Sequence, residues 1–233
     1  MSVYKYYFRI ILFWVVVLQT SLVFSVEGPP AGANPDDVDF RWAFAAMAVS
    51  DGKTTVQPVA QDITLKTGDQ LKMMVELERR CFVYLFHYNP EDGLKLLFPY
   101  TLQQFESDYE VHRKYAVPRG EAWFKLDGKT GKEVFYLLAS AKRLDSLEKA
   151  YLRYESAEPA SKPPAAQAVL DQVRSLRREH RELTGPVERP ITIGGAVRGV
   201  APVEDPKRFD IATMADEIIS SGFVARTYTV EHR

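Results

Sequence analysis

The chain has 233 residues, a formal net charge of -1 and a hydrophobic content of 46%. This hydrophobic share is large enough for a packed core, so a chain that is disordered throughout is excluded. The near-zero charge excludes the strongly basic surface that nucleic-acid binding needs, and we expect no nucleic-acid partner.

The first 25 residues have the pattern of a signal peptide. Lys5 and Arg9 form a basic start, and residues 10–18 are an uninterrupted apolar run. That run is too short to cross a hydrocarbon layer of about 30 Å as a helix, and the residues around Ser25 suit cleavage after it. The alternative is an uncleaved membrane anchor over residues 10–26. Cleavage is favoured and predicts an exported protein, periplasmic or extracellular, that touches a membrane only if this segment is retained.

The remainder is expected to contain one folded domain. Residues 26–37 are rich in Gly, Pro, Ala and Asp, which predicts a flexible leader. Residues 38–233 are expected to form a single β-rich domain, with a helical segment over residues 144–185 as an addition or insertion. Cys81 is the single cysteine, so no internal disulfide is possible, and its apolar neighbours predict a buried thiol rather than a nucleophile.

Alternation of apolar residues predicts the strands. In residues 71–77 every second side chain is apolar, whereas residues 82–88 are apolar on both parities, which predicts a central strand covered on both faces. Glu78, Arg79 and Arg80 are expected to connect these two strands as a pair. The other strands are expected at residues 38–48, 56–59, 63–65, 95–98, 115–118, 122–126, 133–139 and 223–230. Turns are expected at residues 51–52, 67–69, 89–93 and 127–131.

Helical spacing appears only after Ala141. Apolar residues recur at this spacing over residues 144–154 and again over residues 166–183, where arginines at 174–181 lie on the other side and are interpreted as a solvated face. A third helix is expected between the cap Asp210 and the stop Gly222. Its inward residues are expected to be Ile211, Met214, Ala215, Ile218 and Ile219. The segments between helices are expected to be an exposed link at residues 158–164 and a hairpin at 191–200, and residues 101–113 are expected to form a long loop.

These elements together predict a mostly-β fold. The arrangement expected is an antiparallel β-sandwich of about seven to nine strands with two or three peripheral α-helices, a β-rich α+β class. The strand at residues 38–48 is expected to pack against the strand at residues 133–139, and the last strand is expected to return to the same sheet.

Several motifs follow one another in an order that is typical of one family. They are LKTGD at residues 65–69, FVYLF at 82–86, Asp92-Gly93 with LFP at 97–99, Val117-Pro118, and GKEVFYLLAS at 131–140. In this order the chain resembles the family called domain of unknown function 4384, over about residues 62–140. The resemblance implies a domain found on exported bacterial proteins and also joined to kinase or caspase-like domains. The family has no assigned catalytic residues, so the resemblance implies no catalytic site.

The sequence shows no motif for catalysis, a cofactor or a metal. A Gly-x-Ser-x-Gly elbow and a phosphate-binding loop are absent, and the four histidines lack metal-ligand spacing. We therefore expect no cofactor, no metal and no enzymatic activity. The favoured function is a non-catalytic interaction or ligand-binding module of an envelope assembly or sensing system, with another envelope protein as its partner.

Two alternative functions stay open. A hydrolase site spread over loops such as residues 99–121 requires Glu110, His112 and Glu133 to converge, although Glu133 is expected to be a surface residue at a strand end. An aromatic groove for a glycan or peptide requires exposed aromatic side chains, which core packing explains with fewer assumptions. The candidate binding residues for that groove are Tyr84, Tyr88, Trp123 and Tyr136.

Overall fold

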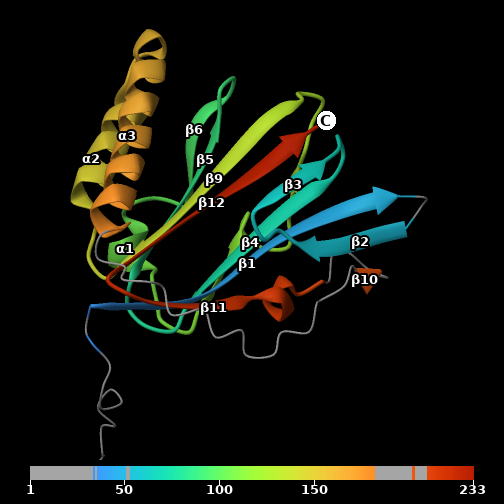
Figure 1. Ribbon diagram of the computed structural model, residues 1–233, viewed down its shortest axis with the longest axis horizontal. Coiled ribbons are helices and arrows are strands. Elements are labelled where there is room, and N and C mark those ends of the chain that lie inside the picture. The colour runs from blue at the N-terminus through green and yellow to red at the C-terminus, as the bar shows by residue number, and fades with distance from the viewer. Residues whose placement is uncertain (1–33, 35, 51–52, 182–200, 203–208) are drawn as a thin grey trace, which may run out of the picture. The chain divides into compact units, whose positions relative to one another are not determined.

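The computed structural model describes residues 34, 36–50, 53–181, 201–202 and 209–233 (Figure 1). The expected signal peptide and most of the leader lie outside these residues, as do the turn at 51–52 and the hairpin at 191–200. The strands are β1 (Asp37–Ser50), β2 (Lys53–Pro58), β3 (Asp62–Leu65), β4 (Gln70–Leu77), β5 (Phe82–Asn89), β6 (Gly93–Phe98), β7 (Lys114–Val117), β8 (Phe124–Lys125), β9 (Gly131–Ser140), β10 (Ala201–Pro202), β11 (Asp216–Ser221) and β12 (Phe223–His232). The helices are α1 (Gln104–Ser107), α2 (Asp145–Ser156) and α3 (Lys162–Arg181), with 3-10 turns η1 (Pro159–Ser161) and η3 (Ile211–Met214).

These strands form two sheets. Sheet A has the order β10-β2-β1-β4-β7, with β11 also paired to β1 and β8 also paired to β4, and sheet B has the order β3-β12-β9-β5-β6. The described pairs are antiparallel except for β3 and β12, which run parallel. The mostly-β fold is confirmed. The described residues contain more strands than the seven to nine expected, and β10 and β11 are the two that no expected strand covers.

The strands β4 and β5 do not pair, although they follow each other closely in the sequence. β4 lies in sheet A between β1 and β7, and β5 lies in sheet B between β9 and β6. The connecting residues cross from one sheet to the other, and the backbone N–H groups of Glu78 and Arg79 both donate to the carbonyl oxygen of Asp39 on β1. The expectation that these two strands form a pair was therefore wrong. Facing sheets let the two strands bury their apolar sides against each other.

The main core lies between the two sheets. Its largest fully buried members include Phe40, Met73, Leu85 and Leu137. The ring of Phe44 on β1 lies 5.1 Å from that of Phe135 on β9 and 5.3 Å from that of Tyr228 on β12. The expected packing of the first strand against residues 133–139 is confirmed.

The helices α2 and α3 cover the other face of sheet B (Figure 1). Tyr84 and Phe86 of β5 point to this side and are buried with Leu147 of α2. The Tyr84 hydroxyl donates to Glu148 Oε1 at 2.6 Å and accepts from the backbone N–H of Leu144 at 3.1 Å. The strand β5 is therefore covered on both faces, as its two apolar sides predict.

The helix expected after Asp210 does not form. Asp210 caps as predicted, since its side chain accepts from the backbone N–H of Ala212 at 2.9 Å, but only the short turn η3 follows before β11 begins. Ile218 is buried and Ile219 is 66% exposed, which is the alternation of a strand and not of a helix. The free edge of β1 pairs with β11, and these tertiary hydrogen bonds override the local helical spacing.

Two smaller expectations also change. The segment at residues 158–164 is only partly a link, because η1 occupies its middle and two of its three prolines, Pro163 and Pro164, lie in the first turn of α3. Proline is tolerated there because the first N–H groups of a helix have no intrahelical partner. The loop at residues 101–113 contains the short helix α1.

Candidate functional site

One end of the inter-sheet core is closed by polar side chains instead of apolar ones. On β5, His87 and Asn89 continue the parity of Leu85, which faces sheet A. On β9, Glu133 continues the parity of Phe135. Because alternate residues of a strand share a face, all three polar side chains point between the sheets. They mark the place where the apolar core ends.

A cavity of about 240 Å³ opens at this end. Its apolar lining residues are Leu71, Leu97, Phe124, Leu126 and Phe135. Its polar lining residues are His87, Asp92, Lys95, Lys125, Asp127, Glu133 and His232. An apolar concavity with a few convergent polar groups is the usual form of a small-molecule site, and this one is somewhat smaller than most such sites.

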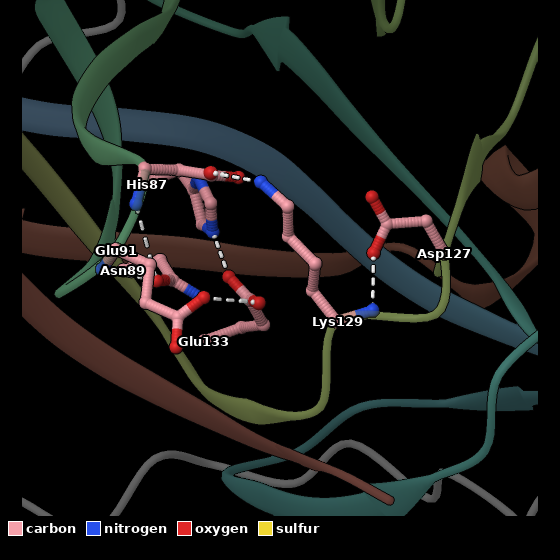
Figure 2. A network of polar contacts seen from close by, with 7 residues as sticks. His87, Asn89, Glu91, Asp127, Lys129 and Glu133 are labelled. Carbon is pink, nitrogen blue, oxygen red and sulfur yellow. Dashed lines mark hydrogen bonds and ion pairs between the residues drawn. The ribbon is translucent and has the colours of Figure 1, made fainter.

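Glu133 is the centre of a buried hydrogen-bond network (Figure 2). Its Oε2 lies 2.5 Å from His87 Nε2, and its Oε1 accepts from Asn89 Nδ2 at 2.6 Å. Burial by itself raises the pKa of Glu133, but the bonds from His87 and Asn89 outweigh it and hold the pKa below its usual range. The carboxylate is therefore charged and has a partner on each oxygen, so His87 carries its proton on Nε2.

Asn89 joins this network to the expected turn at residues 89–93. Its Oδ1 accepts from the backbone N–H of Glu91 at 2.7 Å, while its amide group donates to Glu133. Gly93 has a φ of 80°, and its neighbour Leu94 donates its backbone N–H to the Tyr154 hydroxyl at 3.1 Å. The turn is confirmed, and it orients the Glu133 network through Asn89.

Lys129 ties two loops together at the rim (Figure 2). Its Nζ lies 3.0 Å from Asp92 Oδ1 in the β5–β6 turn, and its backbone N–H donates to Asp127 Oδ1 at 2.9 Å. The hydrogen bond between the side chains lowers the pKa of Asp92 and raises that of Lys129. Both side chains are exposed, so the pair contributes little stability and serves mainly to position the two loops.

Thr67 and His232 form a hydrogen bond in which His232 is the donor. The Thr67 hydroxyl donates to the carbonyl oxygen of Asp127 at 2.9 Å, and Thr67 Oγ1 also lies 3.1 Å from His232 Nε2. A hydroxyl has one proton, so His232 Nε2 must donate to it. His232 therefore does not act as a base toward Thr67, and the pair is not an activated nucleophile.

The four aromatic residues predicted to form a groove lie in different places. Tyr84 is fully buried under the helices, where it cannot meet a ligand. Tyr88 and Tyr136 are half-buried on that same face of sheet B. Trp123 lies with the cluster on the outer face of sheet A, 5.8 Å from Lys72 Nζ. The four do not share one surface, and a binding role for Tyr88 and Tyr136 stays a prediction.

The three residues of the hydrolase alternative make separate contacts. Glu110 is exposed and lies 3.8 Å from Arg113, and His112 Nδ1 lies 3.2 Å from Glu78 Oε2. Glu133 instead bonds to His87 and Asn89, so the convergence that this alternative requires is not observed. Glu133 is 9% exposed, so the expectation of a surface residue was wrong. The partners that compensate its burial come from β5, about 45 residues away in sequence.

Other chemically active groups lie away from the cavity or are inert. Cys81 is fully buried, as expected, and burial raises the pKa of its thiol to about 11. Within the described ranges, no three His, Cys, Asp or Glu residues gather as a metal-ligand group. No helix in these described ranges has both the length and the apolar character that crossing a membrane requires.

His87 and Asn89 are the site residues that sequence reasoning missed. The sequence contains part of the evidence for them. Both residues lie at the end of an otherwise apolar strand, and they share a face of it with Val83 and Leu85. Nothing local indicates that Glu133 lies opposite them, because the register of β5 against β9 is a property of the folded sheet.

The fold and site define a two-sheet β-sandwich with a helical layer on one side and a polar-rimmed cavity at one end. Residues 64–143, about a third of the chain, match the family described as Domain of unknown function (DUF4384). The expected resemblance is confirmed, and the matched range contains every lining residue of the cavity named above except His232. No curated protein and no solved structure matches the chain.

Proposed function

We propose that the protein is a non-catalytic ligand-binding or interaction module that acts outside the cytoplasm, and that the cavity between the sheets is its binding site. The observation that carries this proposal is the preformed character of the cavity. Its buried polar groups are already bonded to one another, and its floor is apolar. Such a site binds without first reorganising its own side chains.

The chemistry of the same groups supports binding rather than catalysis. Glu133 has a lowered pKa and two hydrogen-bond donors, which makes it a poor general acid. Thr67 uses its proton on a backbone carbonyl, and Cys81 is buried as a thiol. Catalytic turnover of any substrate by the purified protein, lost on replacement of Glu133 or His87, would refute this part of the proposal.

Export is the second part of the proposal. It is supported by the basic start and the apolar run of residues 10–18, and by the association of the resembling family with exported bacterial proteins. The intact mass of the protein recovered from the envelope fraction tests it: a chain that begins at Val26 is expected. A full-length chain confined to the cytosol would contradict export.

A cavity-filling variant tests the binding site. Leu97 lines the cavity, so Leu97→Trp is expected to fill it, whereas Leu152→Trp places the same ring on the exposed side of α2. Tagged wild type and both variants are to be recovered from the envelope of the cells that make the protein, and co-purifying molecules identified by mass spectrometry. A ligand or partner kept by wild type and Leu152→Trp but lost by Leu97→Trp supports the proposal, provided that thermal melting shows both variants folded. Equal recovery by all three would refute a role for the cavity.

A further inference from the structure

The acidic and the basic side chains around the cavity differ in whether they have hydrogen-bond partners. Each acid that lines it has a hydrogen-bond donor: Glu133 has two, Asp92 has the Lys129 ammonium and Asp127 has the Lys129 backbone N–H. Lys95 also lines it, and its side chain forms no hydrogen bond or ion pair with another residue in the described part of the chain. Lys125 is opposite Gln70 and has the parity of Trp123, so its side chain starts on the outer face of sheet A and not in the cavity. The side-chain charge left without a bonded partner at the cavity is therefore the ammonium group of Lys95.

The position of Lys95 in β6 places this charge at the mouth of the cavity. Lys95 is opposite His87 in the β5–β6 register, and it has the parity of Leu97, which packs against the inter-sheet core. Its stem therefore starts on the cavity side of β6, beside the apolar lining. A lysine that lies along apolar surface presents its ammonium group at the water boundary. Here that boundary is the cavity mouth.

The remaining features limit the size and charge of a ligand. A volume of 240 Å³ accommodates roughly eight to twelve non-hydrogen atoms, by comparison with about 30 Å³ for one water in the liquid. Leu71, Leu97 and Phe135 offer an apolar surface for most of them. Asp92 and Asp127 at the rim would repel a doubly charged phosphate or sulfate ester more than a singly charged group.

From these features we infer that the cavity binds an apolar group that carries one carboxylate, with the apolar part between the sheets and the carboxylate at Lys95. This inference rests on the proposed binding function and names its ligand class. A small aliphatic or aromatic acid and the C-terminal residue of a peptide share this chemistry. In both, the Lys95 ammonium group acts as a point charge on a carboxylate and the body is desolvated against leucine and phenylalanine side chains.

A matched series of probes tests the charge. The full-length protein is to be titrated with 4-phenylbutyrate, 4-phenylbutanol and 4-phenylbutylamine, and binding followed by calorimetry and by the methyl NMR signals of Leu71 and Leu97. The acid is expected to bind at least tenfold more tightly than the alcohol, and the amine more weakly than either. Acetyl-Ala-Phe with a free carboxylate and the same peptide as an amide distinguish the two sources, since tighter binding of the free-carboxylate peptide than of phenylbutyrate indicates a peptide end.

Lysine variants test the position. Lys95→Met keeps the stem and removes the charge, and it is expected to weaken acid binding at least fivefold while leaving alcohol binding unchanged. Lys125→Met on the outer face of sheet A and Lys149→Met on the exposed side of α2 are the controls without effect. If acid and alcohol bind equally, or if Lys95→Met leaves acid binding unchanged, the ligand class is wrong although the cavity binds. If no probe shifts the cavity signals, the binding site of the proposed function fails as well.

Discussion

The conversion of Glu133 to glutamine is the sharpest test of the polar network, because it removes a charge and keeps the shape. The carboxylate accepts from His87 Nε2 at 2.5 Å and from Asn89 Nδ2 at 2.6 Å. Glutamine has one oxygen and one NH₂ group, so it keeps both contacts only if His87 moves its proton from Nε2 to Nδ1, and otherwise one donor faces another donor. Two hydrogen bonds to a charged oxygen thus become neutral ones or one of them is lost, which is expected to lower the free energy of unfolding at pH 7 by about 2–3 kcal/mol.

The same variant makes a prediction about pH. The pKa of Glu133 in the folded protein lies below its usual value, so the ionised form is bound more tightly in the native state than in the unfolded chain. Its contribution is therefore fully present above the unfolded pKa of about 4.3 and is lost as the pH falls through the lower folded pKa. The stability difference between wild type and Glu133→Gln is expected to be constant from pH 7 to about 5 and to shrink towards pH 2.

Denaturant unfolding of both proteins across this pH range measures the effect. Glu110→Gln is the matched control, since Glu110 is exposed, and its stability is expected to change by less than about 0.5 kcal/mol. A Glu133→Gln variant as stable as wild type at pH 7 would show that the network contributes nothing. A difference that persists unchanged at pH 2 would show that the effect comes from packing and not from the charge.

Three further predictions concern the helical layer, a turn and the thiol. Leu147→Ala removes a fully buried side chain from the core between α2 and sheet B. Denaturant unfolding is expected to show that the free energy of unfolding falls by about 2–5 kcal/mol. A fall of less than about 1 kcal/mol would mean that the helices are only loosely packed there. Gly93→Ala and Gly120→Ala both introduce a side chain at positive φ, but only at Gly93 would the new Cβ lie 2.9 Å from the Tyr154 hydroxyl. Gly93→Ala is therefore expected to cost about 1 kcal/mol more than Gly120→Ala, and equal losses would contradict the contact. The buried thiol of Cys81, with its pKa raised to about 11, is expected to resist a thiol reagent at pH 8 until denaturant is added, and rapid labelling of the native protein would disprove its burial.

Alternation and composition predicted most of the strands because each of them buries one or both faces. Residues 71–77, 82–88 and 133–139 are all strands in the structure, and the two apolar sides of β5 correctly predicted cover on both faces. The helices α2 and α3 were predicted for the same reason, since each has an apolar stripe that packs on sheet B. A periodic pattern records which side of an element is buried, and in these cases that was enough.

The candidate site was much less predictable. A single glutamate at the head of a strand is usually exposed, and the residues that compensate Glu133 are on another strand. Residues 211–219 have apolar positions that fit a helix, yet the edge of β1 draws the second half of this segment into a strand. In both cases a partner distant in the sequence decides the outcome, and no local pattern contains that partner.

The sequence by itself determined the class of fold and the resemblance to a family over its central third. The tertiary structure alone decided that β4 and β5 belong to opposite sheets and that Glu133 meets His87 and Asn89 at the open end of the core. The physical reason is that burial periodicity is written along one strand, whereas sheet membership and register depend on which strands come together. The cavity exists only because of that pairing.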